Sequence, residues 1–123
     1  MKRTNPPNPS PRLKMIRIRN KKTYDGDGTY VGRPSPLGNP FTHLKRDTKA
    51  EFKVDTVEEA IDEYRKWLRN KIYNEPESEA AQMFFDLEEF YYLTEELTLL
   101  CWCWPDPCHA DVIAELILER FES

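Results

Sequence analysis

The chain has 123 residues, enough for one domain, and its 39% hydrophobic and 33% charged residues are typical of a globular rather than a disordered protein. No apolar run approaches the ~20 residues that cross a bilayer, and the first residues lead into no apolar segment, so we expect a cytoplasmic protein without signal peptide or membrane span. The net charge of −4 combines eight basic and no acidic residues in 1–22 with ten basic and 22 acidic residues elsewhere, so the body of the chain should repel nucleic acid.

The first part of the chain predicts a tail, two strands and a loop. Residues 1–12 hold four prolines among Asn and Ser, which predicts a disordered basic tail before a single domain over 13–123. Ile16 and Ile18 alternate with basic residues, as in a strand with one outer face. Residues 42–55 show no clear pattern. In chain order, the predicted segments are a strand over 14–19, a turn at 25–28, a strand over 29–31 and a loop over 32–41.

The second part predicts three helices and a strand. Thr56 as N-cap and Glu59 three residues later form a capping box before an apolar helical face. The run 98–104 is apolar on both faces, which is typical of a central strand buried on both sides. Asp106 as N-cap and Pro107 at the first helical position open the last helix. In chain order, the predicted segments are a helix over 57–72, a helix over 77–93, a strand over 98–104 and a helix from 107.

This order of elements predicts an α/β (or α+β) fold, a small single-domain sheet of about three or four strands covered by about three helices. If the first and last strands are parallel neighbours, the crossover between them should be right-handed. Ligands in such sheets bind beyond the carboxyl ends of strands and near helix N-termini. The loop 32–41 and the turn 104–111 both directly follow strands, so we expect them to converge.

The first of these segments, Gly32–Phe41, has the composition of a stiff binding loop. Glycines let a backbone approach a ligand closely, prolines lower the ordering cost of the loop, and the Arg33 guanidinium suits a phosphate or a carboxylate. It is not a Walker loop, because Gly-Lys-Ser/Thr is missing. The alternative is a structural turn in which Arg33 pairs with an acid. The predicted ligand-binding residues are Gly32, Arg33, Gly38, Asn39 and Phe41, with Trp104 from the second segment.

The second segment places Cys108 and His109 in the predicted first turn of the last helix. Unpaired N–H groups and the helix dipole attract anions there, and the same field lowers the pKa of a thiol. His109 and Asp111 are therefore the candidate acid–base residues of a hydrolysis or group transfer, and Cys108 is a candidate nucleophile. The alternative is a set of structural cysteines beside a polar binding turn.

The three cysteines all lie within 101–108. Cys101 and Cys103 are two apart on a predicted strand and point the same way, so a disulfide framework is not expected. With His109 and Cys108 they supply four zinc-type ligands, but no distant second pair is present and adjacent helical residues diverge by ~100°. We therefore expect no cofactor and keep zinc on these four residues as the alternative. We predict structural roles for three other side chains, with Trp67 and Trp102 in the core and His43 on the surface.

The segment Tyr30–Phe41 resembles the Tyr-Ile-Gly-Arg-Pro…Gly-Asn-Pro-Phe signature of the domain-of-unknown-function family 4326, whose members occur in phages and bacteria. Residues 59–68 resemble that family's helix after the loop, and residues 100–113 resemble its Cys-Trp-Cys and Cys-His-x-Asp segment. The resemblance covers about residues 15–118, with Ala110 where the family often has glycine. It implies that both segments are functional, and it supplies no activity.

These patterns favour a site for a small anionic ligand, bearing a phosphate or a nucleotide, between the loop 32–41 and the start of the last helix. The alternative is a non-enzymatic interaction protein, such as a phage factor acting on a host protein, with a structural zinc or cysteine cluster. A third hypothesis is nucleic-acid binding through the basic tail, which the acidic body of the chain disfavours. No pattern fixes the oligomeric state.

Overall fold

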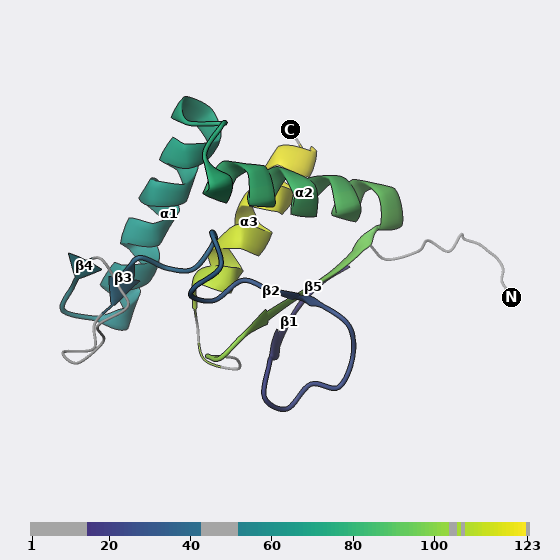
Figure 1. The fold of residues 1–123 in the computed structure, drawn as a ribbon, viewed down its shortest axis with the longest axis horizontal. Coiled ribbons are helices and arrows are strands. Elements are labelled where there is room, and N and C mark those ends of the chain that lie inside the picture. The colour runs from purple at the N-terminus through teal and green to yellow at the C-terminus, as the bar shows by residue number, and fades with distance from the viewer. Residues whose placement is uncertain (1–14, 43–51, 104–105, 107, 123) are drawn as a thin grey trace, which may run out of the picture.

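The computed structural model of the protein describes residues 15–42, 52–103, 106 and 108–122. The predicted tail, His43 and Trp104 lie outside this part of the chain. The structure confirms the predicted small α/β domain with three helices and a small parallel sheet (Figure 1). In chain order, the elements are β1 (Met15–Asn20), β2 (Thr29–Tyr30), β3 (Phe41–Thr42), β4 (Phe52–Lys53), α1 (Val57–Asn74), α2 (Glu79–Thr94), β5 (Glu96–Cys101) and α3 (His109–Glu122).

The main sheet has three parallel strands in the order β1-β5-β2, so the last strand of the chain is the middle strand of the sheet. Met15 of β1 pairs with Glu96 and Asn20 pairs with Cys101, while Tyr30 of β2 pairs with Leu100. The strands β3 and β4 form a separate parallel pair. Because β2 and β5 are parallel neighbours, the segments that leave their carboxyl ends start side by side.

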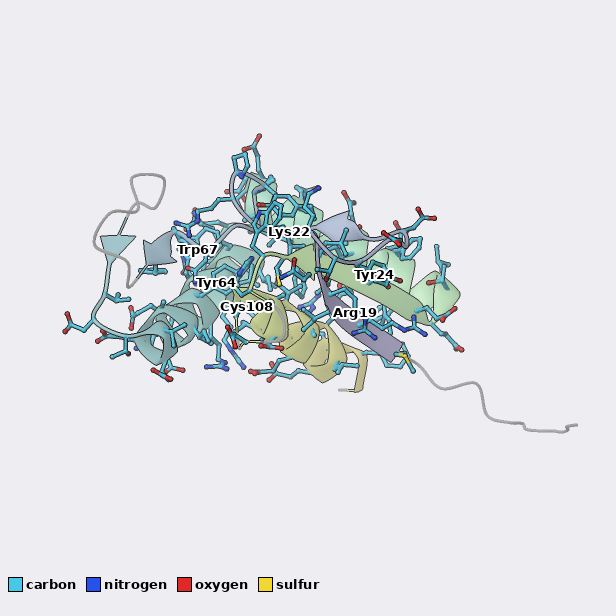
Figure 2. All side chains as sticks on the ribbon, turned by 90° about the horizontal axis from the view of Figure 1, so that it is seen from below. Arg19, Lys22, Tyr24, Tyr64, Trp67 and Cys108 are labelled. Atoms are coloured by element: carbon cyan, nitrogen blue, oxygen red, sulfur yellow. The ribbon has the colours of Figure 1, made fainter. Side chains whose placement is uncertain are left out.

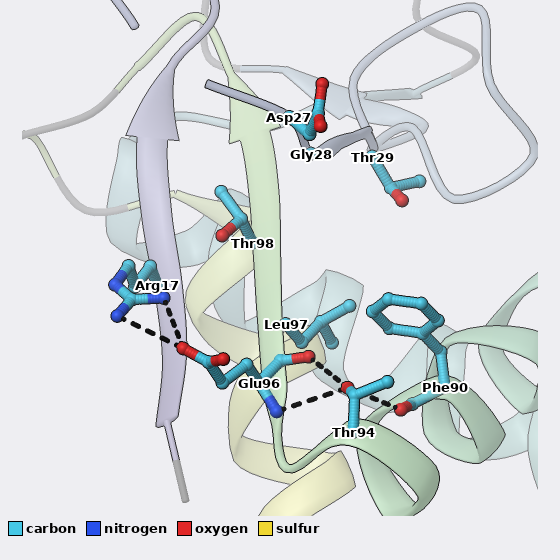
Figure 3. Close-up of a pocket in the computed structure, with 9 residues that line it drawn as sticks. All are labelled: Arg17, Asp27, Gly28, Thr29, Phe90, Thr94, Glu96, Leu97 and Thr98. Atoms are coloured by element: carbon cyan, nitrogen blue, oxygen red, sulfur yellow. Dashed lines mark hydrogen bonds and ion pairs between the residues drawn. The ribbon is translucent and has the colours of Figure 1, made fainter. Parts of the chain in front are cut away.

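The helices cover one face of this sheet, and the other face is only half-buried. Leu97, Leu99 and Cys101 of β5 are buried in the core, whereas Thr98 and Leu100 on the opposite face are half-buried. The prediction that this strand is buried on both sides is therefore wrong for its second face. The backbone of Gly28 covers that face instead of a helix, since a Cβ added there would lie 3.0 Å from side-chain atoms of Leu100 and Thr98 (Figure 3).

Two helix starts show how local hydrogen bonds place the elements. The predicted N-cap opens α1, because Thr56 Oγ1 accepts a hydrogen bond from the N–H of Glu59 at 3.0 Å. The Glu59 carboxylate accepts from the N–H of Asp55 at 2.8 Å, one residue before the position that the capping box predicts. The last helix begins at His109, later than predicted, and Asp106 is not its cap. Instead Asp111 Oδ2 accepts a hydrogen bond from the N–H of Cys108 at 3.0 Å. The acid that bonds to the start of this helix therefore lies within its first turn and not before it.

A partly buried ion pair joins α2 to α3. Arg120 Nε donates to Glu88 Oε2 at 2.5 Å, and Glu88 is only 8% exposed. We expect Arg120→Met to lower the free energy of unfolding, measured by urea denaturation, by about 2–3 kcal/mol because it leaves a buried carboxylate without its cation. Arg69→Met is the matched control: its partners are exposed acids, so its loss should stay within about 0.5 kcal/mol. Equal losses in the two variants would contradict this interpretation.

Candidate functional site

The loop 32–41 and the start of α3 lie together, as the strand ends predict. The link between them is His109, whose Nε2 lies 2.7 Å from the carbonyl oxygen of Val31 at the entrance of the loop. A carbonyl oxygen only accepts, so Nε2 carries the proton and donates it. His109 is 7% exposed, and the first residue of α3 is therefore a buried support of the loop.

Burial also decides the charge of His109. Desolvation lowers the pKa of its imidazole, the positive charge of Arg33 lowers it further, and the bond to Val31 and the charge of Asp111 act in the opposite direction. The imidazole is therefore neutral near neutral pH. Since Asp111 also caps the helix, the geometry gives both candidate acid–base residues a structural hydrogen bond, and their role in a reaction stays a prediction.

Tyr64 of α1 holds the middle of the loop. Its side chain is fully buried, and its hydroxyl donates to the carbonyl oxygen of Leu37 at 2.6 Å. The ring packs edge-on to His109, with centroids 5.2 Å apart, and is stacked on Trp67 at 5.5 Å. Figure 2 shows Trp67, Tyr64 and Cys108 following one another from α1 toward the start of α3. Burial raises the pKa of Tyr64 well above its usual value, so its hydroxyl remains a donor.

Hydrogen bonds within the loop give it a fixed shape. The N–H of Ser35 donates to Gly32 O at 2.8 Å, and the N–H of Gly38 donates to Ser35 O at 2.9 Å. Asn39 Oδ1 accepts from the N–H of Phe41 at 2.8 Å. Asn39, predicted as a ligand contact, therefore uses its side-chain oxygen to shape the loop. It contributes to a ligand site through its place in the loop rather than through this oxygen.

Outside this scaffold lies a pocket of about 450 Å³, called the loop pocket below. Its lining brings together Arg33 and Ser35 of the loop and Trp67 of α1. Ser35 Oγ is buried and has no hydrogen-bond partner in the described part of the chain. The complete lining is Arg33, Pro34, Ser35, Pro36, Gly38, Asn39, Pro40 and Trp67.

Trp67 is the residue of this site that sequence reasoning missed, because its place on the apolar face of α1 predicts core. The structure leaves it half-buried, and it lines both the loop pocket and an adjoining pocket of about 220 Å³ that also contacts Pro36 and Lys71. The sequence gives one sign that Trp67 is only half-buried, namely its position at the edge of the apolar face of α1, three residues after Tyr64.

Gly38 is required by close packing. A Cβ at this position would lie 2.8 Å from the Arg33 backbone and from its Cγ, closer than real Cβ contacts. We expect Gly38→Ala to displace Arg33 from the loop pocket and to lower the free energy of unfolding by about 1–3 kcal/mol. Gly28→Ala, which meets side-chain atoms at 3.0 Å and no backbone atom, is the comparison and should cost less. A Gly38→Ala variant as stable as the parent would contradict this packing.

A second pocket, of about 440 Å³, lies near the amino end of β5 (Figure 3). Its polar groups already bond to one another: Arg17 pairs with Glu96 at 3.4 Å, and the single proton of Thr94 Oγ1 is shared between the carbonyl oxygens of Phe90 and Glu96. The cation of this pocket therefore already has a carboxylate partner.

Trp102 is 56% exposed, so its predicted place in the core is wrong. The reason is that β5 ends at Cys101, where the alternation of faces stops. The indole Nε1 donates to Tyr30 Oη at 2.9 Å, and that hydroxyl donates to the carbonyl oxygen of Arg33 at 2.5 Å. Trp102 and Tyr30 therefore support the backbone of Arg33.

All three cysteines are free thiols. Cys101 and Cys108 are buried with their sulfurs 3.3 Å apart, whereas Cys103 is exposed. Hydrogen bonds to Cys101 and Cys103, together with burial, raise the pKa of Cys108, which opposes the thiolate expected from the helix dipole. A hydrogen bond from Cys108 lowers the pKa of Cys103 to about 7. The more acidic thiol is therefore Cys103.

The four residues of the zinc alternative do not assemble into a metal site. Across the described residues, no group of three or more His, Cys, Asp and Glu side chains is arranged to hold a metal ion. The Nε2 atom of His109 faces Val31 instead. The same part of the chain contains no helix long and apolar enough to cross a membrane.

The chain was also compared with known proteins. No curated protein and no solved structure matches it. A family model described as Domain of unknown function (DUF4326) matches residues 16–119. This match begins within β1 and ends within α3, so it covers far more than half of the chain, including the loop and the start of α3. The chain therefore belongs to the DUF4326 family.

Proposed function

We propose that this domain binds a small anionic ligand with a planar ring, of the nucleotide class, in the loop pocket. The observation that carries the proposal is the shared lining by Arg33, Ser35 and Trp67. Guanidinium groups bind phosphate through paired hydrogen bonds, and a tryptophan face stacks on nucleobases. A volume of about 450 Å³ falls in the range of small-molecule sites.

Preorganisation supports the same proposal. Tyr64 and His109 hold the loop from the core, and Tyr30 holds the Arg33 backbone, so the loop loses little conformational entropy on binding. The ligand lies on the outer side of the loop, and the start of α3 acts as its support. Catalysis by His109, Asp111 or Cys108 would need these side chains to leave their present hydrogen bonds, so we propose binding without a chemical step.

The alternative, a partner-binding protein of phage origin with a zinc-held cluster, has less support. Its zinc set is not arranged as a metal site in the described part of the chain. The observation that most favours this alternative is the exposed side chain of Trp102, which a partner protein could contact. The indole N–H of Trp102, however, already donates to Tyr30.

Isothermal titration calorimetry with nucleoside monophosphates, the matching nucleosides and inorganic phosphate tests the proposal. Arg33→Met should weaken binding of nucleotide and of phosphate at least about tenfold, since it removes a charge-assisted hydrogen bond. Trp67→Leu should weaken nucleotide binding about fivefold or more and affect phosphate binding much less, since it removes the stacking surface and keeps the guanidinium of Arg33.

The matched control is Arg17→Met, which removes the cation of the second pocket. It should leave all three titrations as in the parent. An Arg33→Met protein that binds every probe as the parent does, or an Arg17→Met protein that loses binding, would place the ligand elsewhere and overturn the proposal.

A further inference from the structure

We propose that the exposed corner between the rings of Tyr30 and Trp102 binds a quaternary ammonium group. The corner lies at the carboxyl ends of the three parallel strands, because Tyr30 ends β2, Trp102 follows β5 and Lys21 follows β1. Ligands of open α/β sheets bind at this edge. The inference is independent of anion binding in the loop pocket.

Hydrogen bonds fix the two rings at an angle to each other. The indole N–H of Trp102 donates to Tyr30 Oη at 2.9 Å, and the backbone carbonyl of Trp102 accepts from Asn20 Nδ2 at 3.1 Å. The ring planes meet at 70°, with centroids 6.3 Å apart. Because Trp102 is nevertheless exposed, a preorganised aromatic corner faces solvent.

A cation of the chain itself already occupies this corner. The Nζ atom of Lys21 lies 5.6 Å from the centroid of the Tyr30 ring and 5.9 Å from that of the Trp102 ring. With 6.3 Å between the two centroids, the ammonium is nearly equidistant from both rings. Aromatic faces attract cations within about 6 Å of the centroid, so the geometry of the corner selects positive charge.

The distances in the corner suit a methylated nitrogen. A methyl carbon stands about 1.5 Å from its nitrogen and packs about 3.5–4.0 Å from ring carbons, so a quaternary nitrogen in contact lies about 5–5.5 Å from each ring plane. The Lys21 ammonium is at a similar distance from both rings without methyl groups to fill the space. A quaternary ammonium therefore fits between the rings once the Lys21 side chain swings aside.

Charge and hydration favour such a ligand over Lys21. The chain carries a net charge of −4, which attracts cations and repels anions. Lys21 is exposed and has a flexible stem, so its ammonium returns to water easily. A quaternary ammonium has no N–H groups and loses no hydrogen bonds to water when it enters the corner.

NMR titration of the isotope-labelled chain with choline tests this site. The comparison is the uncharged alcohol in which a tert-butyl group replaces the trimethylammonium group. Choline should bind about threefold or more tightly than this isostere, with saturable shifts at the Trp102 indole, since the two probes differ in charge and not in shape. Acetylated trimethyllysine amide is the third probe, and binding tighter than that of choline would identify a methylated lysine side chain as the source of the group.

Two variants separate the corner from general surface effects. Lys21→Met should tighten choline binding about twofold or more, because it removes the competing ammonium and keeps a side chain of similar length. Trp102→Leu should abolish the preference for choline over its isostere. Phe90→Leu is the matched control, since Phe90 is a similarly exposed aromatic residue on α2, and it should behave as the parent.

Three results would overturn the proposal. The first is equal binding of choline and its uncharged isostere by the parent chain. The second is a Lys21→Met variant that binds choline no more tightly than the parent does. The third is a preference for choline that survives in Trp102→Leu or disappears in Phe90→Leu.

Discussion

Replacing Tyr64 by alanine should lower the free energy of unfolding by about 3–5 kcal/mol, the range for losing a large aromatic side chain from a core. Tyr64 is fully buried between Trp67 and His109, so a cavity would open beneath the loop. The same change removes the hydroxyl that donates to Leu37 O. Urea denaturation of the two proteins measures the loss.

Tyr64→Phe separates packing from hydrogen bonding. It keeps the ring and removes the donor, so we expect a loss of about 1–3 kcal/mol and faster amide exchange at Gly38, whose N–H bonds within the loop. Tyr24→Phe, in the turn after β1 and away from Tyr64 in Figure 2, is the control. Unchanged Gly38 exchange in Tyr64→Phe would show that the loop does not depend on this hydroxyl.

Replacing His109 by alanine should lower the free energy of unfolding at pH 7 by about 2–4 kcal/mol. The change removes a buried ring from the packing against Tyr64 and leaves the carbonyl oxygen of Val31 without its donor. Because this carbonyl begins the loop, the variant should also lose ligand affinity without losing any group that lines the loop pocket.

The same residue makes the fold sensitive to acid. Burial lowers the pKa of His109 in the folded chain below its unfolded value of about 6.5. The unfolded chain therefore binds the proton first as the pH falls, so stability from His109 is complete above about pH 6.5 and is lost between that pH and the lower folded pKa.

Urea denaturation at a series of pH values measures this dependence. The parent and His43→Ala, which changes the only other histidine, should both lose stability below about pH 6.5. His109→Ala should show a flatter profile in this window. Identical slopes in all three proteins would contradict a neutral, buried His109.

Local patterns predicted most elements of the fold because each rests on contacts close in sequence. The capping box at Thr56 and the apolar spacing after it mark α1, and the alternation of Ile16 and Ile18 marks β1. The burial of β5 was predicted less well. Its apolar run does not reveal that the turn at Gly28, rather than a helix, covers its second face.

Sequence also predicted the neighbourhood of the candidate site, but not the direction of its side chains. Two segments that follow parallel neighbouring strands must start together, and Val31 and His109 do meet. By contrast, Trp102 turns outward because β5 ends one residue earlier, and Trp67 lies at the rim of its helix. The places of both side chains depend on tertiary contacts, which residue spacing alone does not predict.

The most direct test of the account is an NMR titration of the isotope-labelled parent chain with adenosine monophosphate. We predict saturable shifts at the Arg33 guanidinium, the Ser35 and Gly38 amides and the Trp67 indole, with the signals of Arg17 and Thr98 unmoved. Shifts centred on Arg17 and Thr98, or saturable binding that leaves Arg33 and Trp67 unmoved, would contradict a ligand site in the loop pocket.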